Sequence, residues 1–162
     1  MNLIVKEENE FVKLVDKEDH QVFLFSSKAN FPAFFAKHYW FVSNKGGELK
    51  RWEVSYKKNK YHEFGYIWTY QHSFSKALHK YIWDKRVHWE KSEIKEIING
   101  NKARNLIRVL EKSLEDYPFK EKYSFYPGPN SNTFVQWVID KFPELNIKLS
   151  WDSFGKNYKT SF

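Results

Sequence analysis

Short segments rich in apolar and aromatic residues follow one another along the first 70 residues of the chain, with clear alternation of apolar and polar positions at 48–56 and imperfect alternation at 11–16. Alternation with a period of two places successive side chains on opposite faces of an extended strand. The pattern therefore predicts strands, separated by turn-forming residues, over residues 11–16, 20–27, 37–44, 48–56 and 62–70.

Two of the connections between these segments predict hairpins. The KED sequence at 17–19 joins the first two segments, and KGG at 45–47 joins the next two in the clearest hairpin of the chain. In the segment 48–56, one face carries Trp52, Val54 and Tyr56, and the other carries Arg51, Glu53 and Ser55. Gly65 indicates a bulge, or a close approach of another backbone, in the last segment.

Residues 71–90 are ambiguous, since SFSKALHKYIW at 73–83 fits a short helix and RVHWE at 86–90 fits an extended segment. Helical signals begin at Ser92. A serine cap, early acidic residues and a closing glycine predict a helix over 92–100. Leucine and valine at helical spacing predict an amphipathic helix over 101–118, and apolar residues that would cover most of the circumference predict a buried helix over 133–142. In the tail that follows the last predicted helix, we expect one short strand and then loop.

Strands that precede helices along a chain indicate an α+β fold. We therefore expect an antiparallel sheet from the N-terminal half, with the C-terminal helices packed on one side of it. The length of 162 residues and the lack of a repeat or linker favour a single domain over residues 1–162.

The composition excludes several kinds of chemical site. Aromatic residues make up 20% of the chain, which suits a β-rich core or a surface on which ligands stack. The chain has no cysteine, so disulfides, thiolate metal sites and a cysteine nucleophile are excluded. His72, His79 and His88 have no metal-ligand spacing with carboxylates, and we expect neither a metal nor another cofactor.

The net charge of +7 raises anionic partners as candidates. The positive residues are spread along the chain, with their densest cluster at 57–60, and no zinc-finger, P-loop or RNA-recognition signature is present. We expect weak binding to anionic surfaces, with nucleic acid as a less favoured partner. The N-terminus does not resemble a signal peptide, and the apolar run 31–42 is too short to span a bilayer, which predicts a cytoplasmic protein without transmembrane segments.

The sequence PGPNSNTF at 127–134 offers three capping residues where a helix start needs one. The first N–H groups of a helix have no internal partners and carry partial positive charge. A hydroxyl there can act as a nucleophile if a base lies next to it, and the N–H groups can stabilise an oxyanion. The alternative is an ordinary cap that follows a Pro-Gly-Pro turn.

The motifs of this region resemble the bacterial family known as domain of unknown function 3750. They are Tyr117-Pro118, the block at 127–134, Pro143-Glu144-Leu145 and Gly155-Lys156-Asn157-Tyr158, where the family has aspartate in place of Asn157. The histidine of His38-Tyr39-Trp40 matches an early strand histidine that is followed two residues later by tryptophan. The resemblance covers roughly residues 37–158.

The order of the polar residues also resembles the circularly permuted papain-like proteins, which include the lecithin:retinol acyltransferase group and the permuted NlpC-type peptidases. In these proteins an early strand histidine is followed by a polar residue on the next strand and by an Asn-Cys-x-x-Phe helix start. Ser131 stands where the nucleophilic cysteine would be. The resemblance implies a permuted papain-like fold with Ser131 as nucleophile, His38 as base and Glu53 as the third member.

The third member has a rival in His62-Glu63, at the start of the next strand. We expect the surplus polar residues to line a pocket, with ligand contacts from Asn130, Asn132, Trp40 and Lys156. Three function classes follow: a hydrolase or acyltransferase acting on a small acyl, amide or peptide ligand, a catalytically inactive binding domain on the same fold, or a basic, aromatic binder of nucleic acid or membrane surfaces. A serine hydroxyl is a weaker nucleophile than a thiolate, which keeps the inactive domain open.

Overall fold

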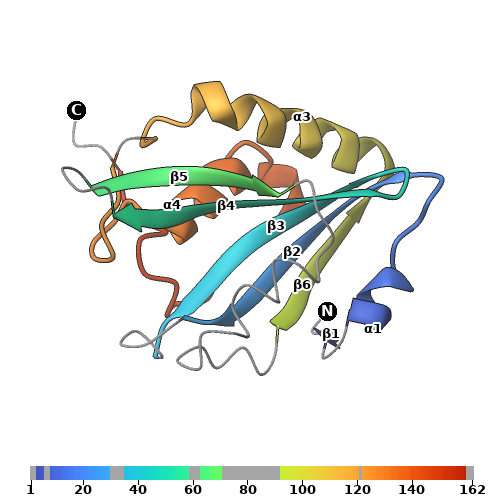
Figure 1. The fold of residues 1–162 in the computed structure, drawn as a ribbon, viewed down its shortest axis with the longest axis horizontal. Coiled ribbons are helices and arrows are strands. Elements are labelled where there is room, and N and C mark those ends of the chain that lie inside the picture. The colour runs from blue at the N-terminus through green and yellow to red at the C-terminus, as the bar shows by residue number, and fades with distance from the viewer. Residues whose placement is uncertain are drawn as a thin grey trace.

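The computed structural model describes residues 3–5, 8–29, 35–58, 63–70, 92–120 and 122–159, and its central element is an antiparallel sheet (Figure 1). The strands are β1 (Leu3–Val5), β2 (His20–Lys28), β3 (Lys37–Lys45), β4 (Glu48–Lys58), β5 (Glu63–Tyr70) and β6 (Ser92–Asn99). They follow the order β1-β6-β2-β3-β4-β5 across the sheet, and every neighbouring pair is antiparallel. The helices are α1 (Glu8–Val12), α3 (Gly100–Asp116) and α4 (Ser131–Ile139), with a short 3-10 helix at Pro143–Leu145.

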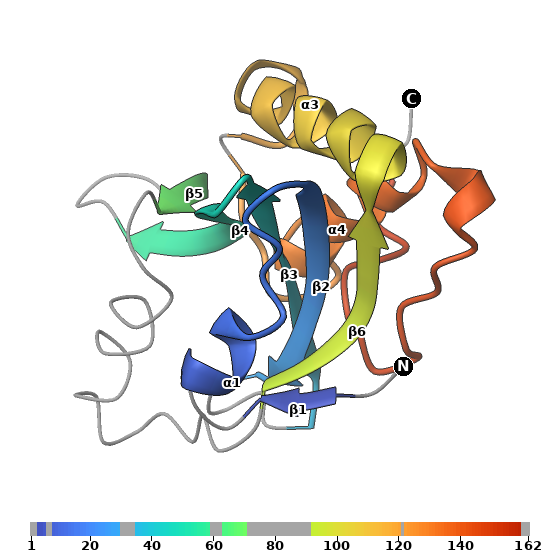
Figure 2. The same ribbon diagram turned by 90° about the vertical axis from the view of Figure 1, so that its right-hand side faces the viewer.

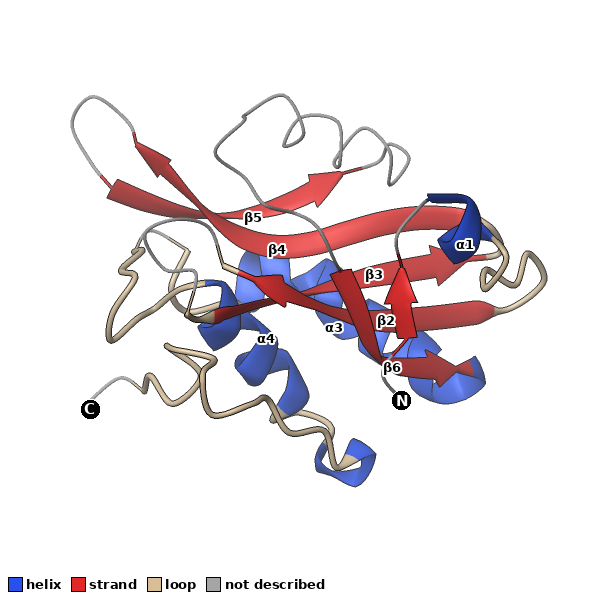
Figure 3. Ribbon diagram, turned by 90° about the horizontal axis from the view of Figure 1, so that it is seen from below, coloured by secondary structure: helices blue, strands red, loops and turns tan. Residues whose placement is uncertain are grey.

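Helices cover both faces of the sheet (Figures 2 and 3). The helices α3 and α4 pack on one face, where the buried core includes Leu24, Phe41, Trp52, Leu106, Leu110, Phe134 and Val138. On the other face, Phe11 of α1 contacts the rings of Phe23 and Phe25 at 4.9 and 5.3 Å between centroids. The α+β class and the packing of the C-terminal helices on the sheet are confirmed, while α1 adds a small layer that the sequence did not predict.

The strands β3 and β4 pair over only part of their length, and this places the candidate site. Their ladder runs from Lys45 opposite Glu48 to Phe41 opposite Trp52, whereas β3 stays paired with β2 as far as Lys37. Figure 1 shows β4 turning away from β3, with α4 behind the divergence. The edge of β3 that β4 leaves is therefore available to other backbone and side-chain partners.

The start of α4 and the C-terminal tail occupy that edge. The Asn132 side chain accepts a hydrogen bond from the Tyr39 N–H at 3.1 Å and donates one to the Lys37 carbonyl at 2.8 Å. The Lys37 N–H donates to the Asp152 carbonyl at 3.1 Å. The Asn132 amide and the Asp152 carbonyl thus pair with the backbone groups of β3 that would otherwise bond to a neighbouring strand.

The predicted helix over 92–100 is wrong, because residues 92–99 form β6 between β1 and β2. The register between β2 and β6 shifts between Leu24 and Phe25. This irregularity lets Ile94 and Ile97 pack with the same core cluster although they are three residues apart. The apolar residues at 94, 97 and 98 therefore imitate helical spacing. The sheet is also not confined to the N-terminal half of the chain.

The predicted strand over 11–16, and with it the hairpin through 17–19, is also wrong. The helix α1 ends at Val12, and a turn follows. Phe11 is fully buried, while Leu14 and Val15 pack partly against the same cluster, so the apolar spacing is that of a helical turn. Burial of Phe11 against β2 decides the local structure.

The other predicted elements are confirmed with small shifts at their ends. The hairpin of β3 and β4 turns at Gly46 and Gly47, which have φ values of 56° and 94° that glycine adopts readily. Gly65 pairs regularly with Tyr56, so β5 has no bulge there. The predicted tail strand is wrong, since the described tail has a 3-10 helix and turns, and residues 71–90 lie outside the described residues. Within the described chain, no helix combines the length and apolar character that crossing a bilayer requires.

Candidate functional site

Three side chains that are distant in sequence form a hydrogen-bonded chain. The His38 Nδ1 atom lies 2.7 Å from the Ser131 Oγ atom, and His38 Nε2 lies 3.1 Å from Glu53 Oε2. Glu53 and Ser131 are buried, at 2% and 6% exposure, whereas the His38 side chain is 22% exposed. The arrangement has the order of a nucleophile, a base and an acidic residue that orients the base.

The three members come from three elements that meet where the sheet divides. His38 lies on the part of β3 that β4 has left, and Glu53 is the first residue of β4 beyond the last ladder pair. Ser131 is the first residue of α4. Because Asn132 holds the helix start against the edge of β3, the preceding serine lies beside the imidazole of His38.

The start of α4 has one uncommitted backbone donor. The Asn130 side chain accepts hydrogen bonds from the N–H groups of Asn132 and Thr133 at 3.0 and 3.3 Å, and the Phe134 N–H bonds to the Asn130 carbonyl. Among the described residues, the N–H group of Ser131 has no hydrogen-bond partner. A helix N-terminus with a donor next to the hydroxyl favours negative charge at this point.

Arg51 keeps the acidic member of the chain ionised. Burial by itself raises the pKa of Glu53, but the charge of Arg51 and the hydrogen bond from His38 lower it, with the net result that the pKa falls from 4.5 to about 2. The Arg51 Nη2 atom donates to Glu53 Oε2 at 2.6 Å, and the arginine side chain is only 6% exposed. A carboxylate can only accept hydrogen bonds, so His38 Nε2 is the donor to Glu53.

The tautomer of His38 follows from this donor. A neutral imidazole carries one proton, so Nε2–H leaves Nδ1 with a lone pair. The Ser131 hydroxyl then donates to Nδ1. The hydroxyl proton of Ser131 thus points at an unprotonated ring nitrogen.

The two asparagines of the motif have structural contacts. Asn130 caps α4 in a capping box with Thr133 and donates to the Phe125 carbonyl at 3.0 Å. Asn132 bonds to β3 and donates to the Phe154 carbonyl at 3.0 Å. Each residue of Asn-Ser-Asn therefore has its own contact: cap, imidazole and strand edge. A ligand-binding role for the asparagines stays a prediction.

Trp40 and Lys156 also face the protein. Trp40 is 1% exposed and stacks between His38 and Phe25, with ring centroids at 5.3 and 5.6 Å. The Lys156 ammonium group donates to the carbonyls of Leu149 and Ser150 at 3.0 and 2.7 Å. Their predicted ligand contacts likewise stay predictions.

The sequence did not single out Arg51 as a site residue, although it placed Arg51 on the same strand face as Glu53. The signal was two opposite charges two residues apart in a strand with apolar residues on its other face. The rival pair His62-Glu63 and the histidines at 72, 79 and 88 lie where the structure describes no side chains. In the described ranges, no three His, Asp or Glu side chains gather as metal ligands would.

Comparison with known proteins agrees with the motifs. The sequence pattern of DUF3750, a family described as protein of unknown function, matches residues 19–158. No curated protein and no solved structure matches the chain. The match covers β2 to α4 and nearly all of the described tail, including all three members of the hydrogen-bonded chain. The chain therefore belongs to the DUF3750 family.

Proposed function

We propose that this protein is an acyl-transfer enzyme, a hydrolase or acyltransferase that acts on an ester, thioester or amide through Ser131. The observation that carries the proposal is the continuous chain from Ser131 Oγ through His38 to Glu53, with contacts of 2.7 and 3.1 Å. Such contacts are within the reach that general-base activation of a serine requires.

The first step is attack of Ser131 Oγ on the substrate carbonyl carbon. The hydroxyl proton moves to His38 Nδ1, and Glu53 stabilises the resulting imidazolium through Nε2–H. The carbonyl π electrons move to the oxygen, which becomes an oxyanion. Collapse of this tetrahedral species expels the leaving group, which takes the proton from Nδ1, and leaves an acyl group on Ser131.

In the second step, water or another nucleophile attacks the acyl carbon and gives its proton to His38 Nδ1. The bond between the acyl carbon and Ser131 Oγ then breaks, and His38 returns this proton to the serine. The Ser131 N–H, which lacks a partner among the described residues, is the backbone donor best placed for the oxyanion. Loss of one such donor typically lowers turnover by about 10²–10³-fold.

The order of histidine, acidic residue and helix-borne nucleophile supports a permuted papain-like arrangement as part of this proposal. The nitrogen that faces Ser131 is Nδ1, whereas in the Ser-His-Asp triad the serine faces Nε2. The roles of the two nitrogens are therefore exchanged, while the direction of proton transfer is the same.

An alkyl fluorophosphonate tests the proposal without knowledge of the substrate. An activated serine forms an O–P bond, fluoride leaves, and the base accepts the hydroxyl proton. Mass spectrometry of the intact protein and its peptides should find one adduct, on Ser131. Ser131→Ala and His38→Ala should abolish it, while Ser124→Ala, which changes a half-buried serine outside the hydrogen-bonded chain, should not.

Absence of the adduct from folded wild-type protein, or its persistence in folded His38→Ala, would contradict the proposal. Folding of each variant is checked by circular dichroism and thermal unfolding. Labelling in the Ser124→Ala variant shows that the reagent and the protein preparation are competent.

A further inference from the structure

The imidazole of His38 contacts side chains on its own strand and on the neighbouring strand β4. His38 and Trp40 are two residues apart on β3, and Arg51 and Glu53 are two residues apart on β4, so each pair shares a face of the sheet. The Arg51 guanidinium carbon lies 4.5 Å from the centroid of the Trp40 ring. Trp40 stacks on His38, and Arg51 also binds Glu53. Arg51 is thus linked to the base by two routes.

We propose that Arg51 is a positioning residue that determines which ring nitrogen of His38 carries the proton. Its effect on catalysis rests on the proposed function above, but its effect on the imidazole does not. Arg51 touches neither His38 nor Ser131 in any of its described contacts, and it acts through Glu53 and Trp40.

The charge of Glu53 decides the tautomer. An ionised carboxylate accepts a hydrogen bond from Nε2–H and leaves Nδ1 free to accept the proton of Ser131. A neutral carboxylic acid can instead donate its own proton to Nε2, which places the imidazole proton on Nδ1. In that tautomer Nδ1 cannot act as a base towards Ser131, even if no atom has moved.

Burial alone would favour the neutral acid, because a carboxylate that is removed from water loses its solvation. Glu53 is 2% exposed, and its Oε1 atom has no hydrogen-bond partner in the described part of the chain. Arg51 supplies the largest effect that opposes burial. Without a cation at this point, the buried carboxyl group would therefore tend to take up a proton.

The stack with Trp40 fixes the plane of the His38 ring, while the charge of Arg51 determines which ring nitrogen carries the proton. The His38 and Trp40 rings are inclined by 26°, and Trp40 is nearly parallel to Phe25, at 7°. The Arg51 side chain packs over the same indole. Because the guanidinium group is planar and always charged, it satisfies both the stack and the ion pair, which an ammonium group does less well.

Nitrogen NMR of the 15N-histidine-labelled protein tests the proposal, with His38→Asn to assign the signals. In wild type, the neutral imidazole of His38 should show a protonated Nε2 and an unprotonated Nδ1. Arg51→Met should shift the population towards protonated Nδ1, whereas Arg51→Lys should retain most of the wild-type tautomer. The fluorophosphonate labelling rate of Arg51→Met should fall by about 10²–10⁴-fold, the range for loss of a working base.

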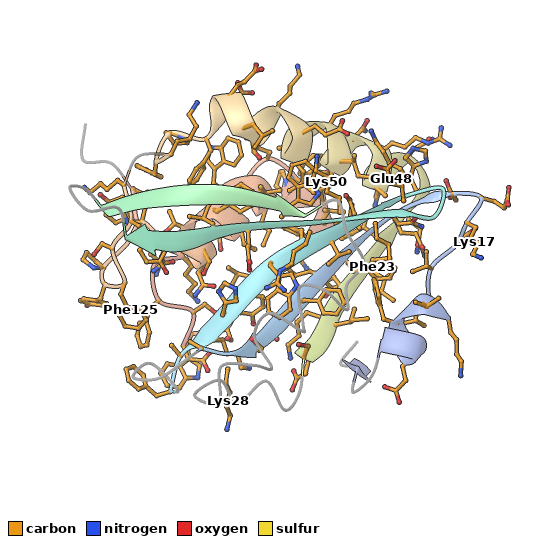
Figure 4. All side chains as sticks on the ribbon, viewed as in Figure 1. Lys17, Phe23, Lys28, Glu48, Lys50 and Phe125 are labelled. Atoms are coloured by element: carbon orange, nitrogen blue, oxygen red, sulfur yellow. The ribbon has the colours of Figure 1, made fainter. Side chains whose placement is uncertain are left out.

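Lys50→Met is the matched control. Lys50 is the neighbouring residue on β4, its ammonium group lies 4.4 Å from the centroid of the Trp52 ring, and it lies on the side of the strand next to α3 (Figure 4). This change also removes a cation from an indole, but on the opposite face of the sheet. It should leave both the His38 tautomer and the labelling rate unchanged.

An unchanged His38 tautomer in folded Arg51→Met would overturn the proposal. If Arg51→Met does not fold, Arg51→Gln serves the same purpose, since it removes the charge but keeps polar donors. An altered tautomer in Lys50→Met would count equally against a specific role for Arg51. If wild type shows the expected tautomer but is not labelled, the proposed acyl-transfer function fails and the assignment of Arg51 stands.

Discussion

Asn132→Ala removes the side chain that ties the start of α4 to the unpaired edge of β3. Three hydrogen bonds are lost: from the Tyr39 N–H, to the Lys37 carbonyl and to the Phe154 carbonyl. Asn132 is 4% exposed and Tyr39 is 3% exposed, so water does not readily replace the lost amide at the strand. The variant therefore leaves a buried backbone donor without its partner.

The cost follows from the number and kind of these bonds. A buried donor without a partner costs about 1–3 kcal/mol, and each of the two carbonyl bonds contributes about 0.5–1.5 kcal/mol. The expected loss in the free energy of unfolding is about 4 kcal/mol, within a range of about 2–6 kcal/mol. In a domain of this size that lowers the melting temperature by roughly 12 °C.

Urea unfolding followed by circular dichroism measures this loss, with the m-value compared between variants. Asn157→Ala is the control, because Asn157 is exposed and has no described hydrogen-bond partner. It should change the free energy of unfolding by less than about 0.5 kcal/mol. A loss below about 1 kcal/mol for Asn132→Ala, at an unchanged m-value, would refute the view that this side chain replaces a strand.

Three further predictions concern stability. The pKa of Glu53 is about 2 in the folded protein and ordinarily 4.5, so ionised Glu53 stabilises the fold above about pH 5. About 3 kcal/mol of this stabilisation is lost as the pH falls to about 2. Glu53→Gln should reduce the pH dependence of the free energy of unfolding, measured with urea over this range, whereas Glu48→Gln, on the opposite face of β4, should not. Equal pH dependence in the two variants would contradict the assignment of this loss to Glu53. Gly155→Ala should lower the free energy of unfolding by more than about 1 kcal/mol in thermal unfolding, since the φ of Gly155 is 88° and the new Cβ would collide with the Asn130 side chain. Tyr117→Phe should preserve or raise the melting temperature, because the buried Tyr117 hydroxyl has no hydrogen-bond partner in the described chain; a loss above about 1 kcal/mol would reveal one.

The sequence predicted elements well where one pattern acted alone. Alternation in β4 and the glycine turn at Gly46 and Gly47 were sufficient for the central hairpin, and the apolar composition of residues 133–142 was sufficient for a buried helix. It failed at β6, where an irregular register brings Ile94 and Ile97 into one core cluster. Pairing with strands distant in the chain decides such a segment, and local spacing does not contain that information.

The candidate site was predictable for a different reason. Ser131 and His38 came from motif resemblance, and Glu53 came from its place on the neighbouring strand. The structural contacts of Asn130 and Asn132 were not predictable, because they depend on where β4 leaves β3 and on how the tail returns to the helix start. Neither of these features has a signature in the local sequence.

The hydrogen bond between His38 and Glu53 joins the two arms into which the sheet divides, so its length depends on the angle between them. His38 belongs to the arm of the sheet that β2 holds, and Glu53 lies on the arm formed by β4 and β5, just past the fork at Phe41 and Trp52. Any change that spreads the two arms lengthens the contact between imidazole and carboxylate without altering either residue. A change in the angle between the two arms therefore alters the hydrogen bond that orients the imidazole next to Ser131.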